Sequence, residues 1–160
     1  MTSPSSASPD GHGARLDAQS IRFERLLPGP IERVWAWLAD ADKRARWLAG
    51  GELPRQPGQT FELHFNHAAL TAETAPARYA QYDRPIVAHH TLLRCEPPRV
   101  LALTWGGAAG EAPSEVLFEL SEAGEQVRLV LTHTRLADRA AMLDVAGGWH
   151  AHLAVLAGKL

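Results

Sequence analysis

The sequence contains a single cysteine, Cys95, in 160 residues. A lone cysteine cannot form an internal disulfide, which excludes the small secreted domains that disulfides hold together. We therefore expect Cys95 to be a buried thiol in a protein of the reducing cytoplasm.

Long hydrophobic runs are missing as well. No stretch approaches the roughly 18 apolar residues that a membrane-spanning helix needs. Residues 1–19 are rich in Ser, Pro, Gly and Asp and contain no apolar segment of the kind found in signal peptides. This segment cannot bury enough apolar surface to offset its ordering entropy, so we interpret 1–19 as a disordered tail. We predict no membrane insertion.

An excess of charge of either sign is also absent. Lys and Arg number 16 against 18 Asp and Glu, the net charge is -2, and no basic run forms a stripe. The electrostatic footprint of a nucleic-acid-binding protein is therefore missing, and we expect no nucleic-acid partner. The length and a hydrophobic content of 46% indicate one globular domain, which we place at residues 20–160.

The first half of that domain alternates between two periodicities. Residues 20–28 alternate as a half-buried strand. From Pro30, apolar residues recur at helical spacing (Ile31, Val34, Trp35, Leu38), which leaves Trp37 off the stripe and partly exposed. Asp40 or Asp42 can cap a second short helix that ends at the glycine pair 50–51.

The second half predicts a strand meander followed by one long helix. Apolar alternation indicates strands near 61–65, 87–95, 100–105, 115–120 and 127–133, whereas 66–85 is weakly patterned. The segment 138–160 contains no proline and carries an apolar stripe with helical spacing, interrupted by the glycine pair 147–148. This pair suggests a bend or the close approach of a neighbour.

Together these elements predict an α+β fold. The expected order is a strand, two short helices, a meander of five or six strands and a long C-terminal helix. A meander cannot bury its apolar face alone, and the last helix is the only element large enough to cover it. The prediction is thus a helix-grip (START-like) fold, a curved antiparallel sheet around the C-terminal helix with an apolar cavity between them.

Several local motifs extend this prediction to a family. They are, in chain order, Val34-Trp35, Trp47, Pro57-Gly58, Glu96-Pro97-Pro98-Arg99-Val100-Leu101, Thr104-Trp105, Leu131-Thr132-His133 and Gly148-Trp149. Their order resembles the activator of heat-shock-protein-90 ATPase homologue-like family of the SRPBCC (START-like) superfamily. The segment 66–85 departs from that pattern, because it lacks the glycine-containing strand of relatives, and the final helix ends early for the family. The resemblance implies a cavity fold shared with lipid carriers, polyketide cyclases and hormone receptors, and a name linked to stress response, but a fold does not determine function.

The predicted binding site is the wall of the cavity. Inward alternation and the aromatic residues of the helices select ten residues: Trp47, Phe61, Leu63, Phe65, Trp105, Phe118, Leu129, Leu131, His133 and Trp149. Among them His133 is the candidate polar anchor for a ligand or a proton carrier. The alternative is a structural histidine bonded to a backbone carbonyl in the core.

Three functions stay open at this point. The first is non-catalytic binding of a small hydrophobic or amphipathic molecule. The second is a cyclase or dehydratase acting on a polyketide-like or aromatic substrate, and the third is a co-chaperone-like interaction domain. We expect no cofactor and no metal, since His150 and His152 are two residues apart and His89 and His90 lie on opposite strand faces. No nucleophile motif supports a catalytic residue, and a homodimer and a chaperone partner stay open.

Overall fold

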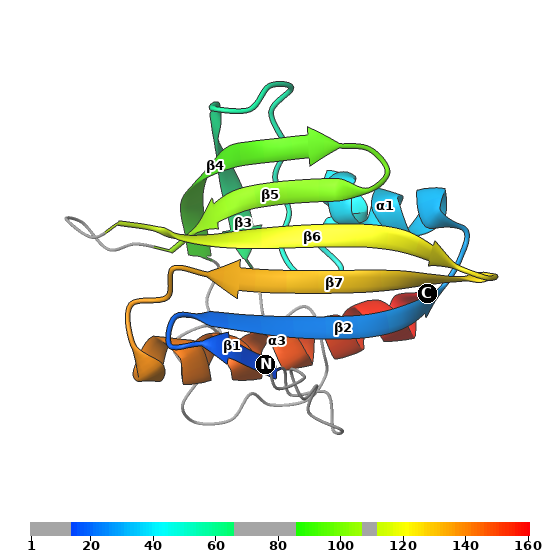
Figure 1. Ribbon diagram of the computed structural model, residues 1–160. Helices are drawn as coiled ribbons and strands as arrows, with labels where there is room; N and C mark the ends of the chain where they lie inside the picture. The colour runs from blue at the N-terminus through cyan, green and yellow to red at the C-terminus, as the bar shows by residue number, and fades with distance from the viewer. Residues whose placement is uncertain (1–13, 66–85, 107–111) are drawn as a thin grey trace.

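A seven-stranded antiparallel sheet forms the body of the protein. The computed structural model describes residues 14–65, 86–106 and 112–160. The strands follow the order β1-β2-β7-β6-β5-β4-β3 across the sheet (Figure 1). Their bounds are β1 Ala14–Asp17, β2 Ser20–Pro28, β3 Thr60–Phe65, β4 Ile86–Glu96, β5 Val100–Trp105, β6 Ser114–Ala123 and β7 Gln126–Thr134.

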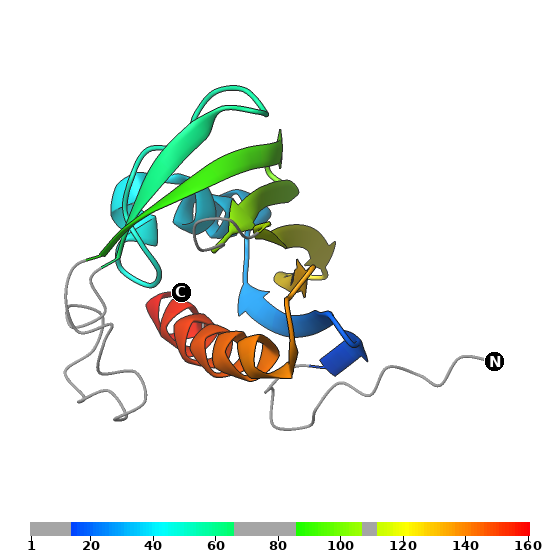
Figure 2. The same cartoon turned by 90° about the vertical axis from the view of Figure 1, so that its left-hand side faces the viewer.

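The sheet curves around the C-terminal helix, as the end-on view in Figure 2 shows. This helix, α3 (Arg139–Lys159), follows the described strands and crosses the concave face. Two short helices, α1 (Ile31–Ala39) and α2 (Ala41–Arg44), connect β2 to the segment before β3. The predicted helix-grip architecture is therefore confirmed.

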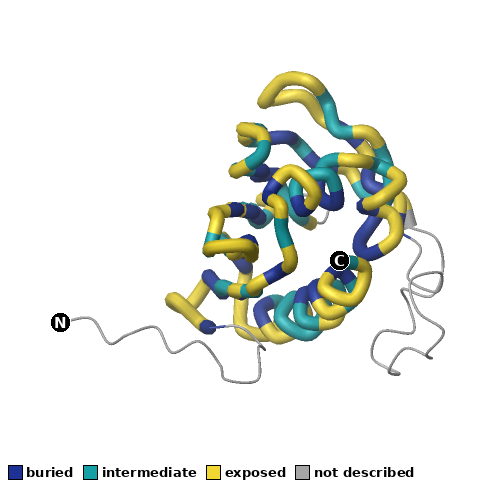
Figure 3. Tube along the Cα trace, turned by 90° about the vertical axis from the view of Figure 1, so that its right-hand side faces the viewer, coloured by how far each residue is buried: buried dark blue, intermediate teal, exposed yellow. Residues whose placement is uncertain are grey.

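Side-chain alternation explains why the strands curve over one core. Val127, Leu129, Leu131 and His133 of β7 are all buried, whereas the residues between them are half-buried or exposed. The same period of two places Phe61, Leu63 and Phe65 of β3 inside. In Figure 3 the buried positions accordingly line the inner side of the arch.

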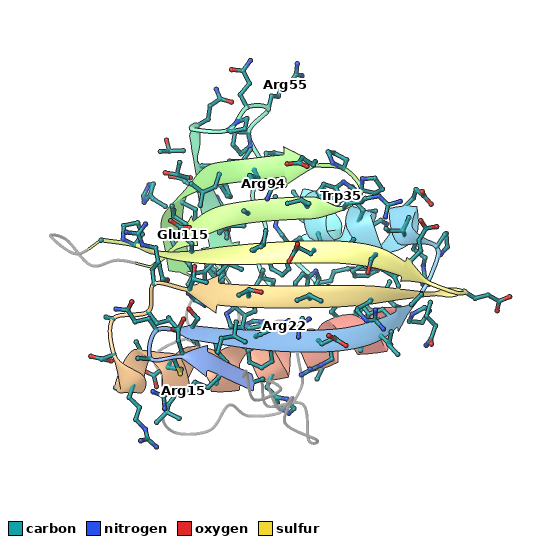
Figure 4. All side chains as sticks on the ribbon, viewed as in Figure 1. Arg15, Arg22, Trp35, Arg55, Arg94 and Glu115 are labelled. Atoms are coloured by element: carbon teal, nitrogen blue, oxygen red, sulfur yellow. The ribbon has the colours of Figure 1, made fainter. Side chains whose placement is uncertain are left out.

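The convex face carries charged side chains, several of them in ion pairs between residues two apart on one strand. Arg22, Arg94 and Glu115 come from three different strands of this face (Figure 4). Arg22 pairs with Glu24 at 3.0 Å, and Arg94 with Glu96 at 2.7 Å. Such exposed pairs contribute at most about 1 kcal/mol each, so this face mainly keeps the sheet solvated on its outer side.

Capping residues set the helix starts. The Asp40 carboxylate accepts hydrogen bonds from the backbone N–H groups of Asp42 and Lys43, and Asp138 caps α3 by accepting from Ala141 at 2.8 Å. Each such cap stabilises a helix by about 1 kcal/mol. Within the described ranges, no helix has the length and apolar character needed to cross a membrane.

A buried arginine holds the two short helices to the chain that follows them. Arg44 is 3% exposed, and its guanidinium donates to the carbonyls of Leu38, Ala39, Ala49 and Gly51. Burial lowers the pKa of Arg44 to about 10, so the side chain stays charged at neutral pH. Four carbonyl acceptors make this buried cation tolerable, since an unpaired buried charge is strongly destabilising.

The structure corrects two details of the sequence interpretation. The ordered fold includes β1, so the domain boundary predicted at residue 20 lies too late; Ala14 is buried where β1 pairs with β2. A four-residue edge strand with three exposed positions carries almost no periodic signal. Trp37 is buried and Trp35 only half-buried, and the Trp37 carbonyl accepts a hydrogen bond from the buried indole of Trp47.

The helix α3 also differs from its prediction. It continues through the glycine pair from Arg139 to Lys159, and a Cβ added at Gly148 would meet no atom within 4 Å. Gly148 is thus not there to admit a close neighbour. The weakly patterned segment 66–85 and residues 107–111 lie outside the described residues.

Replacing Gly148 with alanine should stabilise the protein. Alanine loses less backbone freedom than glycine inside a helix, which gives about 1 kcal/mol. Urea unfolding of Gly148→Ala should show this gain, and the matched change Ala154→Gly on the exposed face of α3 should show a similar loss. A loss of stability in Gly148→Ala would mean that this position does need a glycine.

Gly51 should tolerate no side chain. It has a φ of +107°, and an added Cβ would collide with the Glu62 carbonyl. Gly51→Ala should therefore lower the free energy of unfolding by more than about 2 kcal/mol. Gly58→Ala is the control, because Gly58 has a φ of +91° but open space around it, so only the backbone cost of about 1 kcal/mol applies. Equal losses in the two variants would contradict the collision.

Candidate functional site: the aromatic interior beneath the sheet

The described side chains of the interior enclose a small apolar void. Its volume is about 10 Å³, which is room for about one water molecule. Its walls are Leu38, Arg44, Trp47, Leu48, Leu53, Phe61, Leu63, Leu101, Leu103, Trp105 and Phe118. Ligand pockets commonly measure about 300–1,000 Å³, so the described side chains fill most of the space that the sequence predicted to be open.

An aromatic cluster extends from this void toward the surface, and Trp105 is its centre. Trp105 is the half-buried member of the cluster, whereas its neighbours are buried. The distances from the Trp105 ring centroid are 4.9 Å to Trp149, 5.0 Å to His90, 5.8 Å to Phe65 and 6.4 Å to His133. Rings at these separations attract one another beyond the area that they bury.

His133 lies at the base of this cluster, where it joins α3 to the sheet. The indole N–H of Trp149 can only donate, and it meets Nδ1 of His133 at 3.0 Å. The proton of the neutral ring is therefore on Nε2, which donates to Oγ of Ser114 at 2.6 Å. The Ser114 hydroxyl in turn donates to the Trp105 carbonyl at 2.7 Å. Each side-chain polar atom in this series of hydrogen bonds, from Trp149 through His133 to Ser114, has a partner.

The charge state of His133 follows from its surroundings. The residue is fully buried, and burial lowers its pKa to about 4. The bond from Trp149 acts in the same direction, because it requires an unprotonated Nδ1. His133 is therefore neutral at physiological pH and has no free nitrogen for a ligand. The structure favours the structural alternative over the predicted polar anchor, although the partners are two side chains and not a backbone carbonyl.

His90 is the polar residue that sequence analysis did not select. It is 3% exposed, and its Nδ1 lies 2.7 Å from the Thr104 carbonyl. A carbonyl can only accept, so Nδ1 carries the proton and Nε2 presents a lone pair. Nε2 has no hydrogen-bond partner among the described residues. Burial lowers the pKa of His90, which keeps this lone pair free of a proton near neutral pH.

A signal for His90 was present in the sequence. The strand alternation that separates His89 from His90 places one of them inside, and the structure pairs Phe61 of β3 with His90 of β4. The side chain of His89 is 75% exposed, and its Nε2 lies 3.3 Å from the Glu62 carboxylate. What the sequence lacked was the register between β3 and β4, whose connection is the weakly patterned 66–85.

The ten residues of the predicted cavity wall all point into the interior, but they divide into three groups. Trp47, Phe61, Leu63, Trp105 and Phe118 line the void. Phe65, His133 and Trp149 belong to the aromatic cluster.

Leu129 and Leu131 form the third group. They are fully buried on β7 and are not among the residues that line the void. Their positions are those of ordinary core residues.

The remaining candidate groups among the described residues show neither a metal site nor an activated thiol. Within the described ranges no three His, Cys, Asp or Glu side chains are placed to hold a metal ion. Cys95 is half-buried, and burial raises the pKa of its thiol, which disfavours the nucleophilic thiolate. His152 donates through Nδ1 to the Trp47 carbonyl at 2.7 Å and so links α3 to the segment after α2.

A curved antiparallel sheet that grips a C-terminal helix around an aromatic interior defines the helix-grip class of SRPBCC proteins. Residues 28–160 match the family described as Activator of Hsp90 ATPase homolog 1-like protein. The chain belongs to this family.

Solved structures agree with this assignment. The solution NMR structure of the protein encoded by gene BPP1335 of Bordetella parapertussis is 98% identical, with a TM-score of 0.80 over 99% of this chain and 83% of that one. CalU16 from Micromonospora echinospora is 27% identical, with a TM-score of 0.66 over 94% of this chain and 78% of that one. The AHSA1 protein SPO3351 of Silicibacter pomeroyi shares the fold at 22% identity, with a TM-score of 0.64 over 88% of this chain and 96% of that one. No curated protein matches the sequence.

The neutral state of His133 predicts a defined pH dependence of stability. Its pKa is lowered from 6.5 to about 4 on folding, so the unfolded chain binds more protons between these values. The contribution of His133 to the free energy of unfolding is complete above pH 6.5. It is lost as the pH falls toward 4, and the loss is roughly 3 kcal/mol at most. The stability difference between wild type and His133→Gln should shrink by up to that amount over this range.

An NMR titration of the His133 ring in the wild-type protein provides an independent check, since it requires no variant to fold. The ring signals should not titrate above about pH 5. Protonation near pH 6.5 would contradict the hydrogen-bond chain described above.

Proposed function

We propose that this protein binds a small hydrophobic or amphipathic molecule between the sheet and α3, without catalysing its conversion. The observation that carries the proposal is the aromatic cluster around Trp105. It connects an interior void to the surface through a ring that is only half-buried. A planar apolar molecule could replace ring–ring contacts of Trp105 with equivalent contacts of its own. Membership of a family with the helix-grip fold supports this location.

Binding is favoured over catalysis by the state of His133. A cyclase or dehydratase needs a proton carrier that can reach the substrate, with a pKa near the working pH. The pKa of His133 is about 4, and both of its nitrogens are engaged by Trp149 and Ser114. The cavity wall thus offers apolar contacts, and His133, the histidine that the sequence selected, has a structural task.

Native mass spectrometry of the freshly purified full chain is the direct test. We expect a complex with a small molecule at defined stoichiometry, which organic solvent should release for identification. In parallel, titration with 2-fluoronaphthalene should quench tryptophan fluorescence with a Kd on the order of 10 μM. Trp105→Ala should tighten or speed this binding because it opens space beside the void, whereas Trp35→Ala on α1 should leave it unchanged.

The contrary result would be a protein that purifies without a bound small molecule and whose tryptophan fluorescence does not change when apolar probes are added. The described side chains would then form a permanently filled core. A protein-interaction role of the kind that the family's name describes would become the better proposal, and a binding assay with an Hsp90 chaperone would be the next experiment.

A further inference from the structure

One buried atom of the interior lacks what protein interiors almost always supply. Nε2 of His90 is the single buried side-chain nitrogen or oxygen without a hydrogen-bond partner in the part of the chain that the structure describes. More than about 90% of such groups are paired, and leaving one unpaired costs about 1–3 kcal/mol. The fold keeps this acceptor unpaired in spite of the cost, so the groups around it indicate which kind of hydrogen-bond donor it binds when the protein functions.

The surroundings of this acceptor are aromatic. The ring centroid of His90 lies 5.0 Å from that of Trp105, 5.8 Å from Phe61 and 6.4 Å from Phe65. Phe61 and Trp105 are also walls of the interior void, so His90 lies directly beside the space where a ligand would enter. Flat apolar surfaces with one hydrogen-bonding atom among them are the usual composition of a small-molecule subsite.

The charge of the site restricts the ligand further. Among the described residues on the wall of the void, Arg44 is the one cationic side chain, and its guanidinium is already engaged by backbone carbonyls. His90 is uncharged near neutral pH because burial lowers its pKa. An anionic ligand would therefore meet no free cation on this wall, and a neutral molecule suits it best.

We propose that Nε2 of His90 accepts a hydrogen bond from a neutral aromatic ligand that carries a hydroxyl or N–H group. The ring of such a phenol-like molecule lies beside Phe61 and takes over contacts that the Trp105 ring gives up, and its donor points at His90. Thr104 fixes the tautomer by accepting the Nδ1 proton, so the acceptor is oriented before the ligand arrives. This inference rests on the proposed binding function and assigns the ligand class to it.

Two probes of matched size test the assignment. Full-length protein is titrated with 2-naphthol, which carries the donor, and with 2-fluoronaphthalene, which does not. A site with a dedicated hydrogen-bonding atom discriminates against the analogue that lacks the partner group. We expect 2-naphthol to bind at least about tenfold more tightly. His90→Phe should remove this preference by weakening 2-naphthol alone.

The control variant is His89→Phe, on the same strand but with its side chain on the outer face, 75% exposed. It should leave the affinities for both probes unchanged. A second readout uses the wild-type protein, so that it does not depend on the folding of His90→Phe. The ¹⁵N resonance of His90 Nε2 should have the shift of an unbonded nitrogen, and should move on addition of 2-naphthol but not of 2-fluoronaphthalene.

The outcomes separate the inference from the proposed function. Equal affinity for both probes would overturn the role of His90 while leaving the binding function intact. Binding of neither probe would overturn both. An Nε2 resonance that already has a hydrogen-bonded shift without any probe, and that 2-naphthol leaves in place, would show that a water molecule satisfies His90 and would also overturn the assignment.

Discussion

The attachment of α3 to the concave face of the sheet is the constraint on which the rest of the structure depends. A seven-stranded sheet with one apolar face needs a cover, and α3 provides it through Trp149, Leu153 and Leu156. Apolar packing by itself tolerates sliding and rotation of a helix. The hydrogen bond from Trp149 to His133 adds a directional contact, which defines where along the sheet the helix lies.

The two buried histidines differ in how many of their ring nitrogens have a hydrogen-bond partner. His133 has partners on both nitrogens and is part of the scaffold. His90 has a partner only on Nδ1, and its ring, like that of His133, lies near the Trp105 ring. The same residue type thus serves structure at one end of the aromatic cluster and remains available at the other. Proteins commonly concentrate such departures from full satisfaction at functional sites.

The tight interior has a consequence for how binding would proceed. The void of about 10 Å³ requires side chains to move before any aromatic molecule fits. Trp105 is suited to this movement, because it is half-buried and its contacts in the cluster are aromatic contacts that a ligand can replace. The backbone hydrogen bonds of β5 with β6 do not depend on the ring, so the sheet can remain intact while the side chain changes position.

The order of the elements after β1 and the inward faces of the strands could be predicted from the sequence alone, because alternation with period two and helical stripes are local properties. The sequence also predicted a cap for the second short helix at Asp40 or Asp42, the family, and the inward positions of nine apolar or aromatic residues and of His133. The edge strand β1, the exchanged burial of Trp35 and Trp37, and the near absence of open space were decided by the tertiary structure. Volume depends on how side chains from distant segments interdigitate.

The roles of the two histidines were decided by the tertiary structure for the same reason. Alternation predicted that His133 faces inward and that His89 and His90 lie on opposite faces of their strand. Which group forms a hydrogen bond with each histidine depends on its neighbours in the folded structure. Ser114 and Trp149 reach His133 from 19 and 16 residues away in the chain. The strand register that sets Phe61 opposite His90 depends on long-range pairing. Sequence periodicity specifies which face a residue takes, and only the fold specifies what it meets there.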